Sequence, residues 1–252
     1  MQVIHFLGKV LPETFSITVS YKPTVKWKAE DIGITFEFLF HIENSKIDVE
    51  CRLPEYRAEY FPMIYMRALD LCRAQVDLVA FKNGIGLTVL LESLRDPKGN
   101  VTAIVPIDNR LAEICTAFTL EQGFDQACAN VLRSVPLFMA LRDLISAITV
   151  PHDSLVNCAR AMDRLKYLVA GSNANDVLAW KKLREALRID EAYLKYITEH
   201  SKNPRHGRPG HTPGSVTTEV TCRAWVVMNR YLEYMKRSAG SLPETEFPLL
   251  TG

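Results

Sequence analysis

Residues 34–53 read ITFEFLFHIENSKIDVECRL, and this stretch carries the clearest strand signal in the chain. Phenylalanine occupies every second position from Phe36 to Phe40, which is the spacing of side chains on one face of a strand. Residues 43–45, Glu-Asn-Ser, favour a turn, and apolar residues alternate again from Lys46 to Leu53. The stretch therefore predicts a β-hairpin.

The rest of the first half predicts further strands around one helix. A helical spacing of apolar residues runs over Met63–Phe81, where Pro62 suits a first helical turn and Asn83-Gly84 a stop. Runs of β-branched and aromatic residues, punctuated by turn formers, predict four more strands. They are Val3–Val10, Phe15–Tyr21, Ile85–Leu91 and Val101–Ile107. The N-terminal half is thus expected to be a mainly antiparallel sheet with one long helix.

From about Phe124 onward the strand signals end and helical periodicity takes over. Helices are expected over Gln126–Val135, Leu137–Thr149, Ser154–Ala170, Val177–Arg188, Glu191–His200 and Val216–Arg237. The predicted fold class is α+β, with a β-rich domain over residues 1–120 and an all-helical bundle over residues 124–238. Residues 239–252 are expected to form a loose tail.

Composition favours a soluble globular protein. Of 252 residues, 48% are hydrophobic and 23% charged, and charges interrupt the most apolar stretches, so no membrane span is predicted. The six cysteines are scattered without a CxxC pair, which is typical of free thiols in a reducing compartment. We therefore expect a cytoplasmic protein, and no motif predicts a metal site or a cofactor.

Charge is unevenly distributed, and one loop concentrates it. Residues 125–238 hold 17 Lys/Arg against 11 Asp/Glu, whereas residues 1–124 hold 13 against 16. The loop from His200 to His211 holds three basic residues, Lys202, Arg205 and Arg208, and no carboxylate. It leads into the last predicted helix, whose free N–H groups and dipole favour an anion. The sequence thus predicts phosphate binding at Lys202 and Arg208 beside Arg205.

Arg205 is followed by the polar His206 and then by His211, late in a helical bundle and before its last long helix. This spacing resembles the R-x4–6-H motif of HEPN-domain proteins. A β-rich domain followed by such a bundle is also similar in layout to bacterial ApeA-type defence proteins. The resemblance covers roughly the last half of the chain.

The resemblance implies an RNA-directed protein of a bacterial antiviral defence or stress system, with catalytic members acting as metal-independent endoribonucleases. Arg205 would then hold the scissile phosphate, His211 would exchange protons with the 2′-hydroxyl or the leaving oxygen, and His206 would orient the pair. The partners implied are RNA, a second copy of the chain as a homodimer, and a protein recognised by the N-terminal domain as sensor.

The residues also allow other interpretations. The loop can be a solvated connection whose arginines pair with carboxylates, or it can bind an anion or a protein partner in a non-catalytic sensor or assembly protein. Likewise Arg160, Asp163 and Arg164, one turn apart, form either a solvated helix face or a basic track beside the loop.

Overall fold

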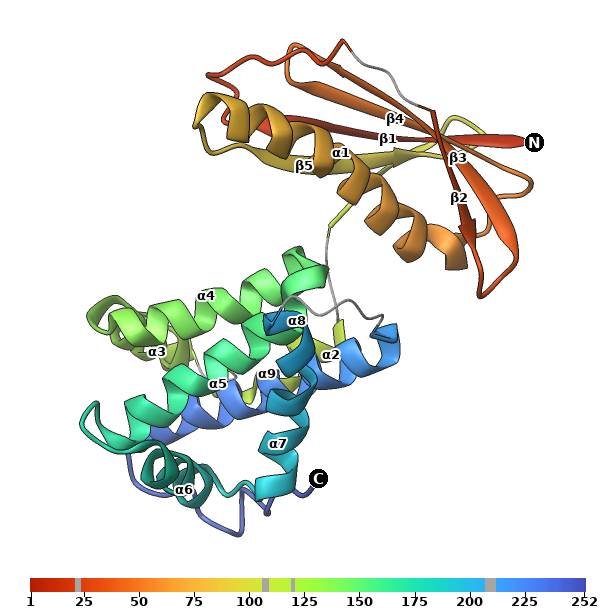
Figure 1. Ribbon diagram of the computed structural model, residues 1–252. Helices are drawn as coiled ribbons and strands as arrows, with labels where there is room; N and C mark the ends of the chain where they lie inside the picture. Colours follow the sequence, from red (N-terminus) through yellow and green to blue (C-terminus); the bar gives the residue numbers. More distant parts are fainter. Residues whose placement is uncertain (21–23, 106–108, 119–120, 207–211) are drawn as a thin grey trace. The chain divides into compact units, whose positions relative to one another are not determined.

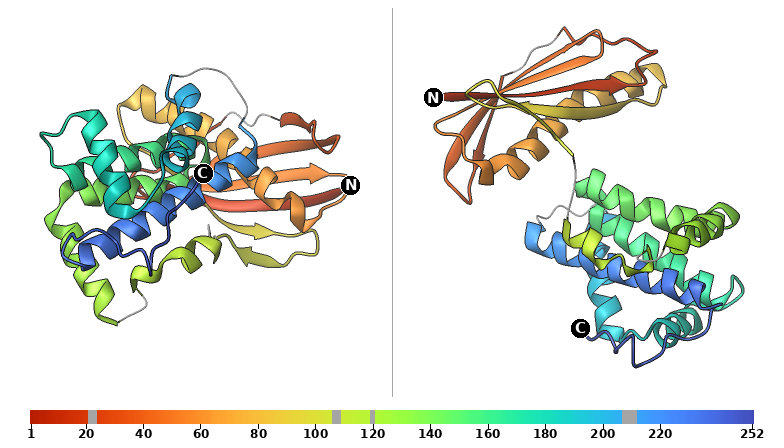
Figure 2. Two further views of the ribbon diagram at one scale, coloured as in Figure 1. Left: turned by 90° about the horizontal axis from the view of Figure 1, so that it is seen from below. Right: turned by 180° about the vertical axis from the view of Figure 1, so that it is seen from behind.

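The computed structural model describes residues 1–20, 24–105, 109–118, 121–206 and 212–252. The chain divides into two units, Met1–Val105 and Pro106–Gly252. In Figures 1 and 2 the first unit is a sheet with one long helix and the second consists of helices. This arrangement confirms the predicted fold class.

The first unit contains a six-stranded sheet with the order β2-β3-β4-β1-β5-β6, and every neighbouring pair is antiparallel. The elements are β1 (Gln2–Leu11), β2 (Thr24–Ala29), β3 (Ile34–Glu43), β4 (Lys46–Leu53), a short 3-10 helix η1 (Ala58–Tyr60), α1 (Phe61–Asn83), β5 (Thr88–Arg95) and β6 (Val101–Ala103). The hairpin predicted over residues 34–53 is β3 and β4, with Phe40 opposite Val49.

Helix α1 covers one face of the sheet (Figure 1). It buries Ile64, Ala68, Cys72 and Val76, which recur every four residues along one side of the helix. These side chains share one core with the inward residues of the strands, among them Phe6 and Phe38. The apolar residues that alternate along the predicted strands therefore face this core, and the residues between them face the opposite side of the sheet.

A glycine is required where β1 passes β5. The register between these strands shifts at Leu7/Gly8, and a Cβ atom on Gly8 would lie 2.1 Å from the carbonyl oxygen of Leu90. Only a residue without a side chain allows the two backbones to approach this closely.

One strand prediction is wrong. Residues 15–18 are not a strand, and in the described part of the predicted segment Phe15–Tyr21 only Val19 forms an isolated bridge, to Ile42. The strand lies instead at β2, which pairs along β3, and its Trp27 ring stacks on Phe36 with centroids 5.6 Å apart. Residues 24–29 form the strand because they can pair with the free edge of β3, where Trp27 packs on Phe36.

The second unit is a helical bundle. Its elements are α2 (Asn109–Ile114), η2 (Thr116–Phe118), α3 (Glu121–Arg133), α4 (Val135–Thr149), η3 (Pro151–Asp153), α5 (Ser154–Ala170), α6 (Asp176–Leu187), α7 (Glu191–His200), α8 (Lys202–Arg205) and α9 (Gly214–Lys236). The core includes Met162 and Leu165 of α5 with Val227 and Tyr231 of α9, all nearly inaccessible to water. Helix α5 contacts α4, α6, α7 and α9.

Helices α6 and α7 each begin after a side chain that caps the helix, as their sequence favours. The side chain of Asn175 accepts a hydrogen bond from the backbone of Leu178 at the start of α6. Asp190 does the same for Tyr193 at the start of α7, at 2.7 Å. Such caps satisfy otherwise unpaired helix N–H groups and fix where α6 and α7 begin.

The sequence-based domain limits differ from the structure at two places. Residues 109–118 belong to the bundle and not to the predicted first domain, because Asn229 of α9 binds both Thr116 and the backbone of Ala117. The prediction of a loose tail is also wrong. Leu242 is buried, and the buried Arg230 donates a hydrogen bond to the carbonyl of Pro248 at 2.6 Å. Buried polar groups of this kind hold the tail against the bundle.

A candidate anion-binding cleft

Three of the five predicted site residues line one cleft. Lys202 and Arg205 are the first and last residues of the single-turn helix α8, and His206 directly follows it. All three contribute to a cavity of about 560 Å³ beside α5, α6 and α7. The other two residues, Arg208 and His211, lie outside the described residues, so their positions relative to Arg205 are not part of this geometry.

The cleft collects charge from four helices, α5, α6, α7 and α8. Its cationic lining residues are Lys166, Lys181, Arg184, Lys195, Lys202 and Arg205, and its carboxylates are Asp163, Asp176, Glu191 and Glu199. The cations outnumber the carboxylates by two, and the neutral wall includes Trp180 and Leu194. An anion is therefore the ligand that this lining favours.

The floor of the cleft is organised by Lys166. Its side chain is only 6% exposed, and its Nζ atom lies 2.7 Å from Asp163 and 2.6 Å from Asp176. The ammonium group also lies over the Trp180 ring, 4.4 Å from its centroid. Burial alone lowers the pKa of Lys166, but the hydrogen bonds to Asp163 and Asp176 outweigh it and hold that pKa above its usual value. The floor is thus a charged support in which Lys166 binds two carboxylates.

Arg205 is tied to this floor. Its guanidinium donates a hydrogen bond to the second carboxylate oxygen of Asp163 at 3.2 Å, while the Arg205 side chain remains 45% exposed. Asp163 thereby joins Lys166 on α5 to Arg205 on α8. The bond holds the guanidinium at the cleft, and because an arginine has five N–H donors it leaves donors for a ligand.

The rim of the cleft consists of exposed lysines in surface ion pairs. Lys195 pairs with Glu191 at 2.7 Å, and Lys202 pairs with Glu199 at 3.8 Å. Exposed pairs of this kind contribute only about 0–1 kcal/mol each. They can therefore exchange a carboxylate for another anion at small cost.

The sequence suggests Asp163 only as part of a helix face or basic track beside the loop, and it does not single out the support residues Lys166 and Asp176. A possible signal was the charge of Asp163 in a basic stretch of helix, but its pairing with Arg205 spans 42 residues of sequence. Arg160 and Arg164 do not form a purely solvated helix face, because both bind the buried Asp143 on α4.

The described residues contain neither a candidate metal site nor a candidate membrane-spanning helix. Within them no group of three or more His, Cys, Asp or Glu side chains could hold a metal ion. None of the helices placed there combines the length and the apolar character that a membrane crossing requires.

The two units match two domains of one protein family. Residues 4–105 match the N-terminal domain of DUF8168, a domain of unknown function, and residues 125–236 match the C-terminal domain of DUF8168. The chain is therefore similar to this family over both halves, in the family's own domain order. Comparison with curated proteins gives no match, and comparison with solved structures gives none either.

Proposed function

We propose that this is an RNA-directed cytoplasmic protein whose helical unit binds RNA phosphates in the cleft between α5, α6, α7 and α8. The observation that carries the proposal is the common location of Lys202, Arg205 and His206 with four further cations. Lysine and arginine side chains that neutralise phosphates supply most of the sequence-independent affinity of proteins for nucleic acids.

The ion pairs of the cleft fit reversible binding of a polyanion. In the free protein the carboxylates of Glu191 and Glu199 partly neutralise the rim lysines Lys195 and Lys202. A phosphate chain replaces these weak contacts with several simultaneous ones. Arg205 contributes a planar, forked donor that matches phosphate oxygens.

Metal-independent cleavage is the activity that the HEPN resemblance adds to this proposal. In that form Arg205 stabilises the charge that develops on the scissile phosphate, and His211 transfers the proton. RNA is the substrate because its 2′-hydroxyl supplies the attacking oxygen. The biological setting that the resemblance implies, a bacterial antiviral defence or stress system, belongs to the same proposal.

The N-terminal unit is proposed as a sensor or partner-binding module. The face of its sheet opposite α1 bears paired charges, with His5 bound to Asp48 at 2.8 Å and Lys9 bound to Glu92 at 3.0 Å. A cavity of about 770 Å³ lies beside these residues and includes His41. A polar concave surface of this kind suits a polar ligand or a protein partner.

A second candidate is a non-catalytic sensor or assembly protein whose helical half dimerises and whose basic loop binds an anion or a protein. The specific observation in its favour is the bond between Arg205 and Asp163, because an arginine already paired with a carboxylate can serve a structural role. This candidate predicts that RNA is neither cleaved nor bound preferentially.

The test is cleavage and binding of labelled total RNA and transfer RNA in EDTA. It compares the wild type with Arg205→Ala/His211→Ala and with Arg133→Ala, which removes an exposed arginine of α3 outside the cleft. Cleavage that only the double variant loses establishes a ribonuclease, and binding without cleavage keeps an RNA-directed protein without chemistry. A folded wild type that binds no RNA at low salt contradicts the proposal and favours the assembly protein.

A further inference from the structure

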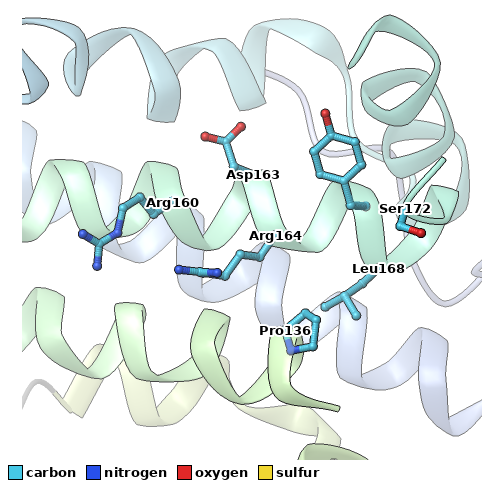
Figure 3. Close-up of a pocket in the computed structure, with 7 residues that line it drawn as sticks. Pro136, Arg160, Asp163, Arg164, Leu168 and Ser172 are labelled. Atoms are coloured by element: carbon cyan, nitrogen blue, oxygen red, sulfur yellow. The ribbon is translucent and has the colours of Figure 1, made fainter. Parts of the chain in front are cut away.

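A second cavity lies on α5 next to the cleft. Its volume is about 580 Å³, and its lining joins apolar side chains, Pro136 and Leu168, to the ring of Tyr167 and to Arg160 and Arg164. Asp163 lines both this cavity and the cleft. In Figure 3 Arg164 extends along α5 on the side of Pro136, whereas Asp163 points to the other side of the helix. Asp163 therefore marks the border between two adjoining sites.

The two arginines of the cavity are held in place by a buried carboxylate of α4. Asp143 of α4 is 4% exposed and accepts hydrogen bonds from Arg160 at 2.5 Å and from Arg164 at 2.9 Å. Each arginine binds Asp143 through one nitrogen only, and because a guanidinium group has five N–H donors, it keeps donors for a ligand. A buried carboxylate that fixes two partly exposed arginines gives the cavity a preorganised positive rim.

The aromatic wall is fixed as well. The hydroxyl group of Tyr167 donates a hydrogen bond to Asp176 at 3.1 Å, and the ammonium group of Lys166 lies 5.1 Å from the ring centroid. The bond to Asp176 raises the pKa of Tyr167, so the ring is uncharged at neutral pH. With 37% of the residue exposed, the ring offers apolar surface to a ligand at little cost in conformational entropy.

We infer that this cavity binds an unpaired nucleobase of single-stranded RNA whose phosphates occupy the neighbouring cleft; the inference rests on the proposed function. An aromatic ring, aliphatic neighbours and arginine planes are the groups on which proteins stack bases. Continuity through Asp163 brings the base site next to the cations that would meet the backbone. A base within a duplex is stacked on adjacent bases and paired with the opposite strand, so it would not enter such a cavity.

The experiment measures binding by fluorescence anisotropy of a short labelled oligouridylate and of an oligonucleotide of the same length with abasic residues. Stacking contributes about 1–3 kcal/mol per base, which corresponds to about 5- to 150-fold in affinity. We expect Tyr167→Ala to weaken oligouridylate binding by a factor in this range and to leave binding of the abasic strand unchanged. Tyr167→Phe keeps the ring and loses only the hydrogen bond to Asp176, so it is expected to bind oligouridylate more tightly than Tyr167→Ala.

A second variant guards against misfolding of Tyr167→Ala. Ser172→Leu adds bulk at an exposed residue of the cavity wall without removing any core side chain, and it should weaken oligouridylate binding alone. Equal affinity of the wild type for both strands, or unchanged oligouridylate binding by both variants, overturns the base site while the phosphate cleft stands. If the wild type binds neither strand at low salt, the proposed function fails and the base site falls with it.

Discussion

Arg205 on α8 donates a hydrogen bond to Asp163 on α5 at 3.2 Å, so the arginine of the predicted site is bound to a carboxylate 42 residues away in the sequence. The same carboxylate accepts a bond from Lys166 at 2.7 Å. The charges of the cleft thus form a connected network rather than independent surface groups. Changes to Asp163 should therefore alter how Arg205 meets an anion.

We expect Asp163→Asn to bind RNA more tightly, by up to about fivefold, because an exposed ion pair contributes about 0–1 kcal/mol and a phosphate no longer competes with a carboxylate for Arg205. The measurement is the Kd for labelled RNA at fixed low salt. Asp125→Asn, on the exposed side of α3 and outside the cleft, is the charge-matched control. Weaker binding by Asp163→Asn than by this control would show that Asp163 itself supports the ligand.

The stability of the bundle should depend on pH through Asp176. The hydrogen bond from Lys166 lowers the pKa of Asp176 below its usual value of 3.8. Because this pKa is lower in the folded state, the stabilisation is present above pH 3.8 and is lost as the pH falls through the folded value. Asp176→Asn should therefore lower the urea midpoint near neutral pH, and the difference from the wild type should shrink in acid. A difference that stays constant down to pH 3.8 and below would contradict this linkage.

Lys166 gives the complementary prediction at high pH. Its pKa lies above the usual value of 10.5, so its contribution is complete below pH 10.5 and is lost as the pH rises through the folded value. Lys166→Met should thus be less stable than the wild type at neutral pH and should approach it in strong base. Urea unfolding followed by circular dichroism measures both series, and parallel curves at all pH values would argue against the network.

Thiol labelling should distinguish the buried cysteines from an exposed one. Burial raises the pKa of Cys51, Cys72 and Cys158 to about 12, so these thiols are protonated at neutral pH, whereas Cys128 is exposed. In the native protein an aromatic disulfide reagent should label Cys128 first, with sites assigned by mass spectrometry. Labelling of Cys158 as fast as Cys128 would mean that α5 is not packed in the core as described.

The C-terminal segment should be released by one substitution. Arg230 donates hydrogen bonds to the carbonyls of Leu187, Arg188 and Pro248, which links α9, the end of α6 and the tail. Arg230→Met keeps most of the apolar side chain but removes these donors. We expect faster chymotrypsin cleavage after Leu249 in the variant than in the wild type or in the control Lys182→Met, which changes an exposed residue of α6. Equal cleavage rates would indicate that other contacts hold the tail.

The sequence predicts elements well where the decisive pattern is local. The alternation of phenylalanines from Phe36 to Phe40 and the apolar repeat of α1 need only neighbours along the chain to be interpreted. Prediction from sequence fails where a residue distant in the chain determines whether a segment is ordered. Strand β2 forms because β3 offers an edge, and the tail is ordered because Arg230 reaches Pro248.

The same division applies to the candidate site. Lys202, Arg205 and His206 could be selected because they stand together in a short basic loop. Lys166 and Asp176 could not, because they reach the cleft only through the packing of α5, α6 and α8. Tyr167 and Asp143 of the second cavity likewise carry no local motif.

The most direct test of the central claim is the salt dependence of RNA binding by the wild type and by Lys202→Ala/Arg205→Ala, with Lys182→Ala/Arg133→Ala as the charge-matched control. Each lost phosphate contact should reduce the slope of log affinity against log salt concentration by about 0.7 for single-stranded RNA. We predict weaker binding and a smaller slope for the cleft variant alone. If both double variants bind with the affinity and slope of the wild type, the cleft does not bind RNA phosphates and the account is wrong.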